Sequence, residues 1–333
     1  MITEEPEDFA PVAKGACRIC LGKSGRAFPA NGFDWFHCGG CGAVQKVLTQ
    51  REYLDLNPTY DPGEYLESAS RQHIERFLRV DHATKVLDRV LQRRAKSAFP
   101  RNERRTFLDV GCGMGAYLLA AQRLGFDVVG FEPSKDHAQV ATKHLRLPVI
   151  ADYFSPDRVV GRTFDLIMLS HVIEHIYAPK QFLHDLIGVL KPGGTLIVIT
   201  PNSDSVVAWV TGRLWPMLKP VDHVTMLCAK TYSFFGLDEL ADVEHRRSEY
   251  AYEFAATMAA VAKAKIKERS AAKIETAQSG GFISPPPLRR LSSKALMLRC
   301  ALTAASAPWW LLAAATRRQA CLTSILVRKA IAQ

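Results

Sequence analysis

The stretch LDVGCGMGAYL, residues Leu108–Leu118, decides the fold. Its apolar start runs into Gly111, Gly113 and Gly115, spaced G-x-G-x-G, and a helix-like segment follows. This spacing is one residue tighter than the dinucleotide fingerprint G-x-G-x-x-G. Glycines let the backbone approach a ligand closely, and the first N–H groups of a helix point toward its polar end. The stretch therefore predicts a buried strand, a ligand-binding turn and a helix.

Strand-like and helix-like segments alternate along the chain around this turn. The strand candidates are Thr106–Val110, Asp127–Phe131, Pro148–Ala151, Phe164–Leu169 and Gly194–Thr200. Helical apolar patterns cover Ala116–Leu124 and Pro179–Leu190. Such alternation is typical of βαβ units around a parallel sheet, so the sequence predicts an α/β fold.

An acidic residue follows the second strand candidate. The segment DVVGFE ends in Glu132, 21 residues after Gly111. That position suits a carboxylate that accepts both ribose hydroxyls of an adenosine. In the alternative interpretation, Glu132 caps the helix that begins after Pro133.

These residues together resemble a known family. Asp109, the three glycines and Glu132 resemble motif I and the following acidic position of class I S-adenosylmethionine-dependent methyltransferases. FDLIMLSHVIEHI (164–176) and LKPGGTLIVITPN (190–202) resemble the fourth- and fifth-strand segments, and the HVxEH wording is typical of the small-molecule branch. The resemblance implies a Rossmann-like seven-stranded sheet of order 3-2-1-4-5-7-6 with the seventh strand antiparallel. CLTSILVRK (321–329) resembles that last strand, whereas the sixth is hard to place between residues 233 and 288.

The same resemblance implies S-adenosylmethionine as cofactor and a set of residues that bind it. Asp109 would lie near the methionine amino group, Asp152 would bond the adenine amino group, and Tyr153 would flank the ring. The full predicted cofactor set is Asp109, Gly111, Gly113, Gly115, Glu132, Asp152, Tyr153 and Ser170.

Four cysteines near the start of the chain predict a zinc site. Cys17-x-x-Cys20 and Cys38-x-x-Cys41 are separated by seventeen residues, the spacing of a Cys₄ zinc ribbon. Four thiolates leave no open coordination position, so the zinc would be structural. In the alternative, the thiols bind no metal. The pattern also resembles the N-terminus of a subset of these methyltransferases, many of which act on sugar nucleotides, glycans or natural products.

Three histidines are candidates for the general base. Methyl transfer needs alignment of donor and acceptor, and a hydroxyl or carbon acid must also lose a proton. His171 follows the fourth strand, His175 comes one helical turn later, and His223 belongs to an Asp-His step that resembles one found in the same branch. Each could instead have a structural role. Glu174 is expected to be solvated or to interact with a helix dipole.

The charge of the chain is concentrated in two segments. The 333 residues carry a formal net charge of +10, which favours a polyanion or an anionic membrane surface as partner. Most of the excess lies in residues 89–105 and in residues 276–333, and the latter contain no Asp or Glu. Basic residues mixed with paired Trp and Leu predict that residues 289–318 form a helix at an anionic membrane interface. Packing on the core and contact with RNA are the alternatives.

The predicted organisation has four parts. These are a zinc-ribbon module (1–50), a helical linker or cap (51–105), the S-adenosylmethionine-binding methyltransferase core (106–250), and a helical, basic C-terminal region that ends in the last core strand (251–333). The acidic start MITEEPEDFA contains no secretory signal pattern, which favours the cytoplasm or a peripheral place at the inner membrane face.

The predicted function is methyl transfer to a small-molecule or glycan-type acceptor, such as a sugar nucleotide, a lipid-linked saccharide or a natural product. The alternatives are a zinc-ribbon ribosomal RNA methyltransferase and a non-catalytic scaffold with the same fold. Few basic residues surround Cys38 and Cys41, and LSHVIEH differs from the [DNS]PP[YF] step of base-amine methyltransferases. Both features argue against nucleic acid as the substrate.

Overall fold

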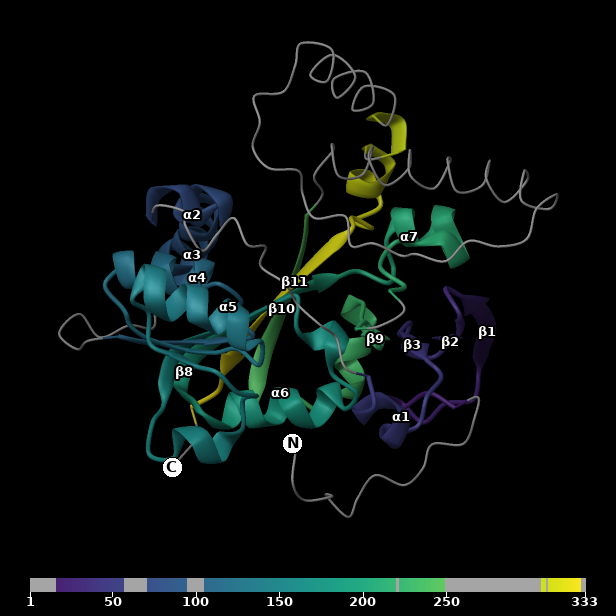
Figure 1. Cartoon of the computed structure of the whole chain (residues 1–333). Helices are drawn as coiled ribbons and strands as arrows, with labels where there is room; N and C mark the ends of the chain where they lie inside the picture. Colours follow the sequence, from purple (N-terminus) through teal and green to yellow (C-terminus); the bar gives the residue numbers. More distant parts are fainter. Residues whose placement is uncertain are drawn as a thin grey trace, which may run out of the picture.

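Two β-sheets organise the protein (Figure 1). The computed structural model describes residues 16–56, 71–94, 105–219, 222–248, 307–309 and 311–330. In this part of the chain, a seven-stranded sheet has the order β10-β11-β8-β7-β4-β5-β6, and a four-stranded sheet has the order β1-β2-β3-β9.

The seven-stranded sheet has the predicted methyltransferase order. Its strands are β4 (Thr106–Val110), β5 (Asp127–Phe131), β6 (Val149–Ile150), β7 (Phe164–Ser170), β8 (Leu190–Pro201), β10 (Ala241–Ser248) and β11 (Cys321–Arg328). Strands β4 to β8 are parallel, whereas β11 runs antiparallel to both β8 and β10. The predicted α/β class, the order 3-2-1-4-5-7-6 and the antiparallel seventh strand are therefore confirmed.

Three strands differ from the sequence prediction. Strand β6 is shorter than predicted, and β8 begins at Leu190, so it includes the KPGG segment. Leu190 pairs with Phe164 ahead of a register shift, which extends the pairing of β7 and β8 across that segment. The sixth strand is β10, whose sequence ADVEHRRS is mostly polar because it lies at the edge of the sheet. An edge strand buries few side chains, so it carries little apolar periodicity.

Helices cover both faces of the large sheet. They are α1 (Gln50–Leu54), α2 (Arg71–Phe77), α3 (Val80–Arg94), α4 (Ala116–Arg123), α5 (Lys135–Gln139), α6 (Pro179–Gly188) and α7 (Val206–Thr211), with shorter turns η2 (Val140–His144), η3 (Pro156–Val159), η4 (Ile173–His175), η5 (Gly212–Leu214) and η6 (Ala229–Phe234). Alternate residues of β4 bury opposite faces: Phe107 packs with α3 and α4, and Leu108 packs with α6. This period of two is the reason why one strand contributes to both cores.

The four-cysteine segment (residues 17–46), hereafter the ribbon, forms the smaller sheet together with one strand from the core. Strands β1 (Gly25–Ala30), β2 (Phe33–Cys38) and β3 (Val44–Lys46) pair antiparallel, and β9 (Thr225–Met226) adds the fourth strand to β3. Trp35 and Met226 belong to one apolar cluster with Val206 and Trp215. The ribbon is therefore packed against the loops that follow β8.

Parts of the predicted organisation lie outside the described residues. These parts are residues 57–70 and 95–104 of the helical linker and most of the basic C-terminal region, including 289–306 of the predicted interfacial helix. Within the described residues, no helix has the length and apolar character needed to span a bilayer. The four domain boundaries stay predictions.

Candidate active site

The glycine turn is shaped by its neighbours. Gly111, Gly113 and Gly115 all have positive φ, at 69°, 53° and 90°. A Cβ on Gly111 would lie 2.4 Å from Val172, and one on Gly115 would lie 2.6 Å from Leu147, whereas one on Gly113 would meet nothing within 4 Å. Packing therefore requires the two outer glycines. The central one presents bare backbone to open space, as a ligand-binding turn must.

Glu132 accepts a hydrogen bond from the backbone of this turn. One of its carboxylate oxygens accepts the N–H of Gly113 at 2.7 Å, and the other accepts the N–H of Ser134 at 2.9 Å. Ser134 in turn caps α5 by accepting the N–H of His137. The helix-end contact that was the alternative interpretation is thus present. It does not exclude ligand binding, because each carboxylate oxygen has a second lone pair that could accept a ribose hydroxyl.

Asp109 is a buried acid whose second oxygen lacks a partner. Asp109 is 1% exposed, and among the described residues no group hydrogen-bonds to its Oδ2. Burial and the nearby charge of Glu132 raise the pKa of Asp109 well above its usual value. An unpaired buried carboxylate is costly, and a bound cation would offset that cost. The ammonium group of S-adenosylmethionine fits this requirement, so the residues present suit the predicted cofactor.

The other predicted cofactor residues, Asp152, Tyr153 and Ser170, are more exposed than Asp109 and Glu132. Asp152 accepts the N–H of Tyr153 at 2.8 Å with one oxygen and forms an ion pair with Arg158 through the other. The Tyr153 residue is 59% exposed, and Ser170 ends β7 with intermediate exposure. Arg158 was not singled out in the sequence because its partner depends on the fold of the loop after β6. The adenine contact stays a prediction.

A histidine and a buried glutamate follow β7. His171 has a left-handed backbone, with φ at 56°, and its Nδ1 lies 3.2 Å from Oε1 of Glu174. The other oxygen of Glu174 accepts the hydroxyl of Thr200 at 3.0 Å. Burial alone would raise the pKa of Glu174, but the hydrogen bond from His171 and three nearby histidines lower it to about 2. The expectation that Glu174 is solvated is therefore wrong, since the residue is fully buried.

A pair of stacked histidines lies beside Glu174. The rings of His175 and His223 meet edge to face with centroids 4.9 Å apart. Nδ1 of His175 donates to the carbonyl oxygen of Asp222 at 2.9 Å, and Nδ1 of His223 donates to that of Met217 at 2.7 Å. Because both Nδ1 atoms must carry protons, the lone pairs lie on Nε2. Burial, with a smaller contribution from His175, lowers the pKa of His223 to about 4, so this ring is neutral near pH 7.

The same groups have a spacing that a metal ion could bridge. Ligand atoms of Glu174, His175 and His223 lie within 4.8 Å of one another. However, both oxygens of Glu174 already accept hydrogen bonds, from His171 and Thr200. The cluster is therefore satisfied as a hydrogen-bonded network, and its arrangement supports proton handling by imidazole near neutral pH. All three predicted base candidates belong to this network.

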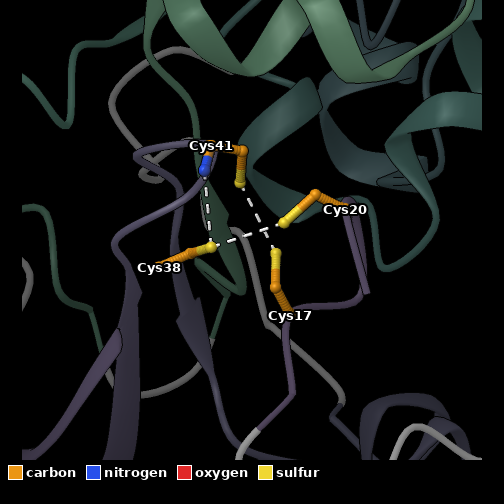
Figure 2. A group of neighbouring side chains, drawn as sticks. All are labelled: Cys17, Cys20, Cys38 and Cys41. Atoms are coloured by element: carbon orange, nitrogen blue, oxygen red, sulfur yellow. Dashed lines mark hydrogen bonds between the residues drawn. The ribbon is translucent and has the colours of Figure 1, made fainter. Parts of the chain in front are cut away.

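The four cysteines converge as the zinc prediction requires. Figure 2 shows their sulfur atoms turned toward one another; the Cys17–Cys41 and Cys20–Cys38 sulfur distances are both 3.5 Å. Sulfurs bound to one tetrahedral zinc at about 2.3 Å lie about 3.8 Å apart. The side-chain amide of Gln45 donates to the Cys17 sulfur at 2.8 Å, and the hydrogen bond from Cys41 lowers the pKa of Cys17 to about 5. Thiolate-stabilising donors of this kind are expected around a metal.

Arg18, between two of these cysteines, connects the ribbon to the histidine network. Its guanidinium donates to the carbonyl oxygens of Lys46 at 2.7 Å and Val224 at 3.1 Å, and to the Thr225 hydroxyl at 3.1 Å. It also lies 4.5 Å from the centroid of the Tyr177 ring. Val224 directly follows His223 in the sequence, so Arg18 holds the segment that carries the neutral imidazole. No local pattern reveals the contact with this segment, because Val224 and Thr225 lie more than 200 positions from Arg18.

The sheet order, the glycine turn and the buried acid together define the fold of S-adenosylmethionine-dependent methyltransferases. The family described as "Methyltransferase domain" matches residues 77–243. The chain belongs to this family.

Curated relatives match a shorter part of the chain. The human mitochondrial ubiquinone biosynthesis O-methyltransferase is 35% identical over 104 residues, which cover 28% of each chain. The ubiquinone biosynthesis O-methyltransferase of Parvibaculum lavamentivorans is 35% identical over 101 residues, covering 29% of this chain and 40% of the relative. The chain thus spans less than half the length of these relatives.

Two solved structures match this chain at low sequence identity and with TM-scores below 0.5. A SAM-dependent methyltransferase from Archaeoglobus fulgidus has a TM-score of 0.40 at 14% identity and covers 74% of this chain and 94% of its own. The plantazolicin methyltransferase BpumL, solved with SAH, has a TM-score of 0.43 at 14% identity and covers 81% and 91%.

Proposed function

We propose that this protein transfers a methyl group from S-adenosylmethionine to a hydroxyl of a small-molecule or glycan-type acceptor. The observation that carries the proposal is the unpaired, buried oxygen of Asp109 beside the open backbone of Gly113. Both lie where β4 ends, at the carboxyl edge of the sheet, where open α/β sheets bind ligands.

The cofactor would be held by residues of the first two strands and their turns. Asp109 would receive the ammonium group, Gly113 would lie against the chain of the methionine, and Glu132 would accept ribose hydroxyls. The bound cofactor supplies a methyl group on a positively charged sulfur. The protein then has to align the acceptor with that group, because displacement at carbon requires a linear approach.

The histidine network would remove the acceptor proton. Glu174 is ionised near pH 7, so His171 donates its Nδ1 proton to it, and a proton taken up by His171 would bind Nε2. His223 is neutral at the same pH and also has its lone pair on Nε2. Two imidazole bases next to a buried carboxylate favour a hydroxyl acceptor, and the relatives named O-methyltransferases support this choice.

The activity is tested by label transfer. The protein is incubated with S-adenosylmethionine labelled on its methyl group and with sugar nucleotides, lipid-linked sugars, phenols or ribosomal RNA. Label is expected in a hydroxyl-bearing small molecule or saccharide. Label in RNA alone would refute the proposed acceptor class, and failure of the intact protein to bind S-adenosylmethionine in calorimetry would refute the methyltransferase assignment.

We also propose that Cys17, Cys20, Cys38 and Cys41 hold one structural zinc ion and that the ribbon and the core act as one unit. The four converging sulfurs and the amide donor Gln45 support the metal. The strand β9, which the core contributes to the ribbon sheet, supports the single unit. Metal analysis is expected to find one zinc per chain, and a metal-free, fully folded protein would contradict it.

A further inference from the structure

The helix near the end of the chain exposes apolar side chains on most of its surface. Helical residues 307–309 and 311–315 contain no charged side chain. Trp309, Leu311 and Leu312 are 40%, 55% and 42% exposed, whereas Ala313 is fully buried. A helix that is apolar on every side is normally covered by protein or lipid.

A second helix adds a larger aromatic residue to this region. In α7, Val206 and Val207 pack in one apolar cluster with Ala313, and the N–H of Val206 donates to the carbonyl oxygen of Arg318 at 2.8 Å. Figure 1 shows α7 beside the yellow C-terminal helix. Trp209, two positions after Val207, points away from this cluster and is 67% exposed. The two helices thus expose two Leu side chains and two Trp rings in one region, whereas single exposed apolar residues scattered over a surface are normal.

The charge of the region identifies what covers it. Arg213 and Arg317 are exposed at the ends of the two helical stretches. Arg318, the next residue, forms an ion pair with Asp204, which leaves Arg213 and Arg317 as the exposed basic side chains of the region. Exposed Trp rings beside arginines are characteristic of surfaces that lie at the headgroup level of a membrane, where the ring is apolar at one end and polar at the other.

We infer that α7 and the described residues 307–309 and 311–318 form a docking surface for an anionic lipid membrane. The Trp209, Trp309, Leu311 and Leu312 side chains enter the interface, and the arginines contact lipid headgroups. The segment that leads into α7 leaves the carboxyl end of β8, next to the end of β7 that carries His171. The docked surface therefore lies at the sheet edge of the candidate active site, so an acceptor carried by a lipid would be close to the histidine network.

The inference is tested by co-sedimentation of the full-length, zinc-loaded protein with vesicles. Phosphatidylcholine vesicles with phosphatidylglycerol are compared with vesicles of phosphatidylcholine alone. The protein is expected to bind the anionic vesicles only, and added salt should weaken binding. The double variant Trp209→Ser, Trp309→Ser is expected to bind at least about tenfold more weakly, the factor that about 1.4 kcal/mol of lost burial produces.

A matched control separates docking from general surface polarity. Val160 is 80% exposed on the loop before β7, and Val160→Ser should leave vesicle binding unchanged. Both variants should keep the circular dichroism spectrum and the thermal unfolding midpoint of the parent protein, which shows that they are folded. The inference is overturned if the double variant binds anionic vesicles as well as the parent. It is also overturned if the parent is a dimer that the double variant dissociates, because the surface is then a contact between two copies. Methyl transfer is not measured, so these outcomes are independent of the proposed function.

Discussion

The cofactor end and the acceptor end of the candidate site differ in how far along the chain their parts lie. At the cofactor end, Asp109, the glycine turn and Glu132 all fall within two successive strands and their turns. At the acceptor end, Glu174 is held by Thr200 of β8, and the His223 segment is held by Arg18 of the ribbon. The first end is a local structure, whereas the second exists only when distant segments have assembled.

The ribbon is hydrogen-bonded to the acceptor end of the site. The hydroxyl groups of Ser203 and Thr231 donate to the carbonyl oxygens of Gly42 and Cys41, beside the second cysteine pair. Arg18, beside the first pair, reaches Val224. Residues at both cysteine pairs of the ribbon are therefore hydrogen-bonded to loops at the acceptor end. We expect damage to the ribbon to affect the acceptor end and to leave the cofactor end unchanged.

The largest expected effect comes from a substitution at the cofactor end that should leave the acceptor end unchanged. In Gly113→Arg, the new side chain enters the open space at the turn, and its backbone must keep a φ of 53°. We expect S-adenosylmethionine affinity, measured by calorimetry, to fall by more than about 100-fold. The acceptor end should be intact, so the NMR signals of the His175 and His223 rings should keep their positions.

A matched control shows whether strain alone has this effect. Gly161 also has a positive φ, of 76°, and open space around it, but it lies on the loop before β7. Gly161→Arg should bind the cofactor like the parent. Equal losses in the two variants would mean that the glycine turn has no special place in binding.

The next effect is a loss of folding stability at low pH that originates at the acceptor end. Burial lowers the pKa of His223 from 6.5 to about 4, so the folded state favours the neutral ring. The resulting stability is present above pH 6.5 and is lost as the pH falls toward 4. Between pH 7 and pH 5, His223 should therefore account for a loss of about 2 kcal/mol in the free energy of unfolding. Glu174, with its pKa lowered to about 2, loses its contribution only at lower pH.

Urea unfolding of the parent and of His223→Asn at both pH values measures this effect. The variant should be less stable at pH 7 and should lose less stability on acidification. His144 is the control, since it is only half-buried, in η2 outside the histidine network, and His144→Asn should keep the pH dependence of the parent. An unchanged pH dependence in His223→Asn would show that its ring is not held neutral by burial.

The contrast between the two ends also explains what could be predicted from the sequence. The glycine turn and the four cysteines were visible because each rests on spacing within one short segment, whereas the strand order was implied by the resemblance to the methyltransferase family. The burial of Glu174 was not visible, because it depends on Thr200 of a neighbouring strand. Strand β9 has only two residues and pairs with β3 at least 180 positions earlier, so no local pattern could reveal it. Spacing along the chain predicts local sites well, whereas a site built from long-range contacts requires the fold.

The smallest expected effect tests the bond between the ribbon and the acceptor end. Arg18→Met keeps most of the side-chain volume but removes the hydrogen bonds to Lys46, Val224 and Thr225. We expect kcat for methyl transfer to fall about tenfold, in line with losses seen when an outer hydrogen bond that orients a functional group is removed. The affinity for S-adenosylmethionine should not change, because no residue of the cofactor end contacts Arg18 among its described partners.

Arg26→Met is the matched control, because Arg26 belongs to the same ribbon but is exposed on β1. A purely structural role for Arg18 would lower the thermal stability and leave the kinetics of the folded fraction unchanged. A positioning role predicts in addition that the pH profile of kcat shifts, because the His223 ring is less well held and becomes more hydrated. Hydration favours the protonated ring, so the acidic limb of the profile should move to higher pH in Arg18→Met and stay in place in Arg26→Met. If both variants keep the profile of the parent, the ribbon supports the fold but does not position the acceptor end.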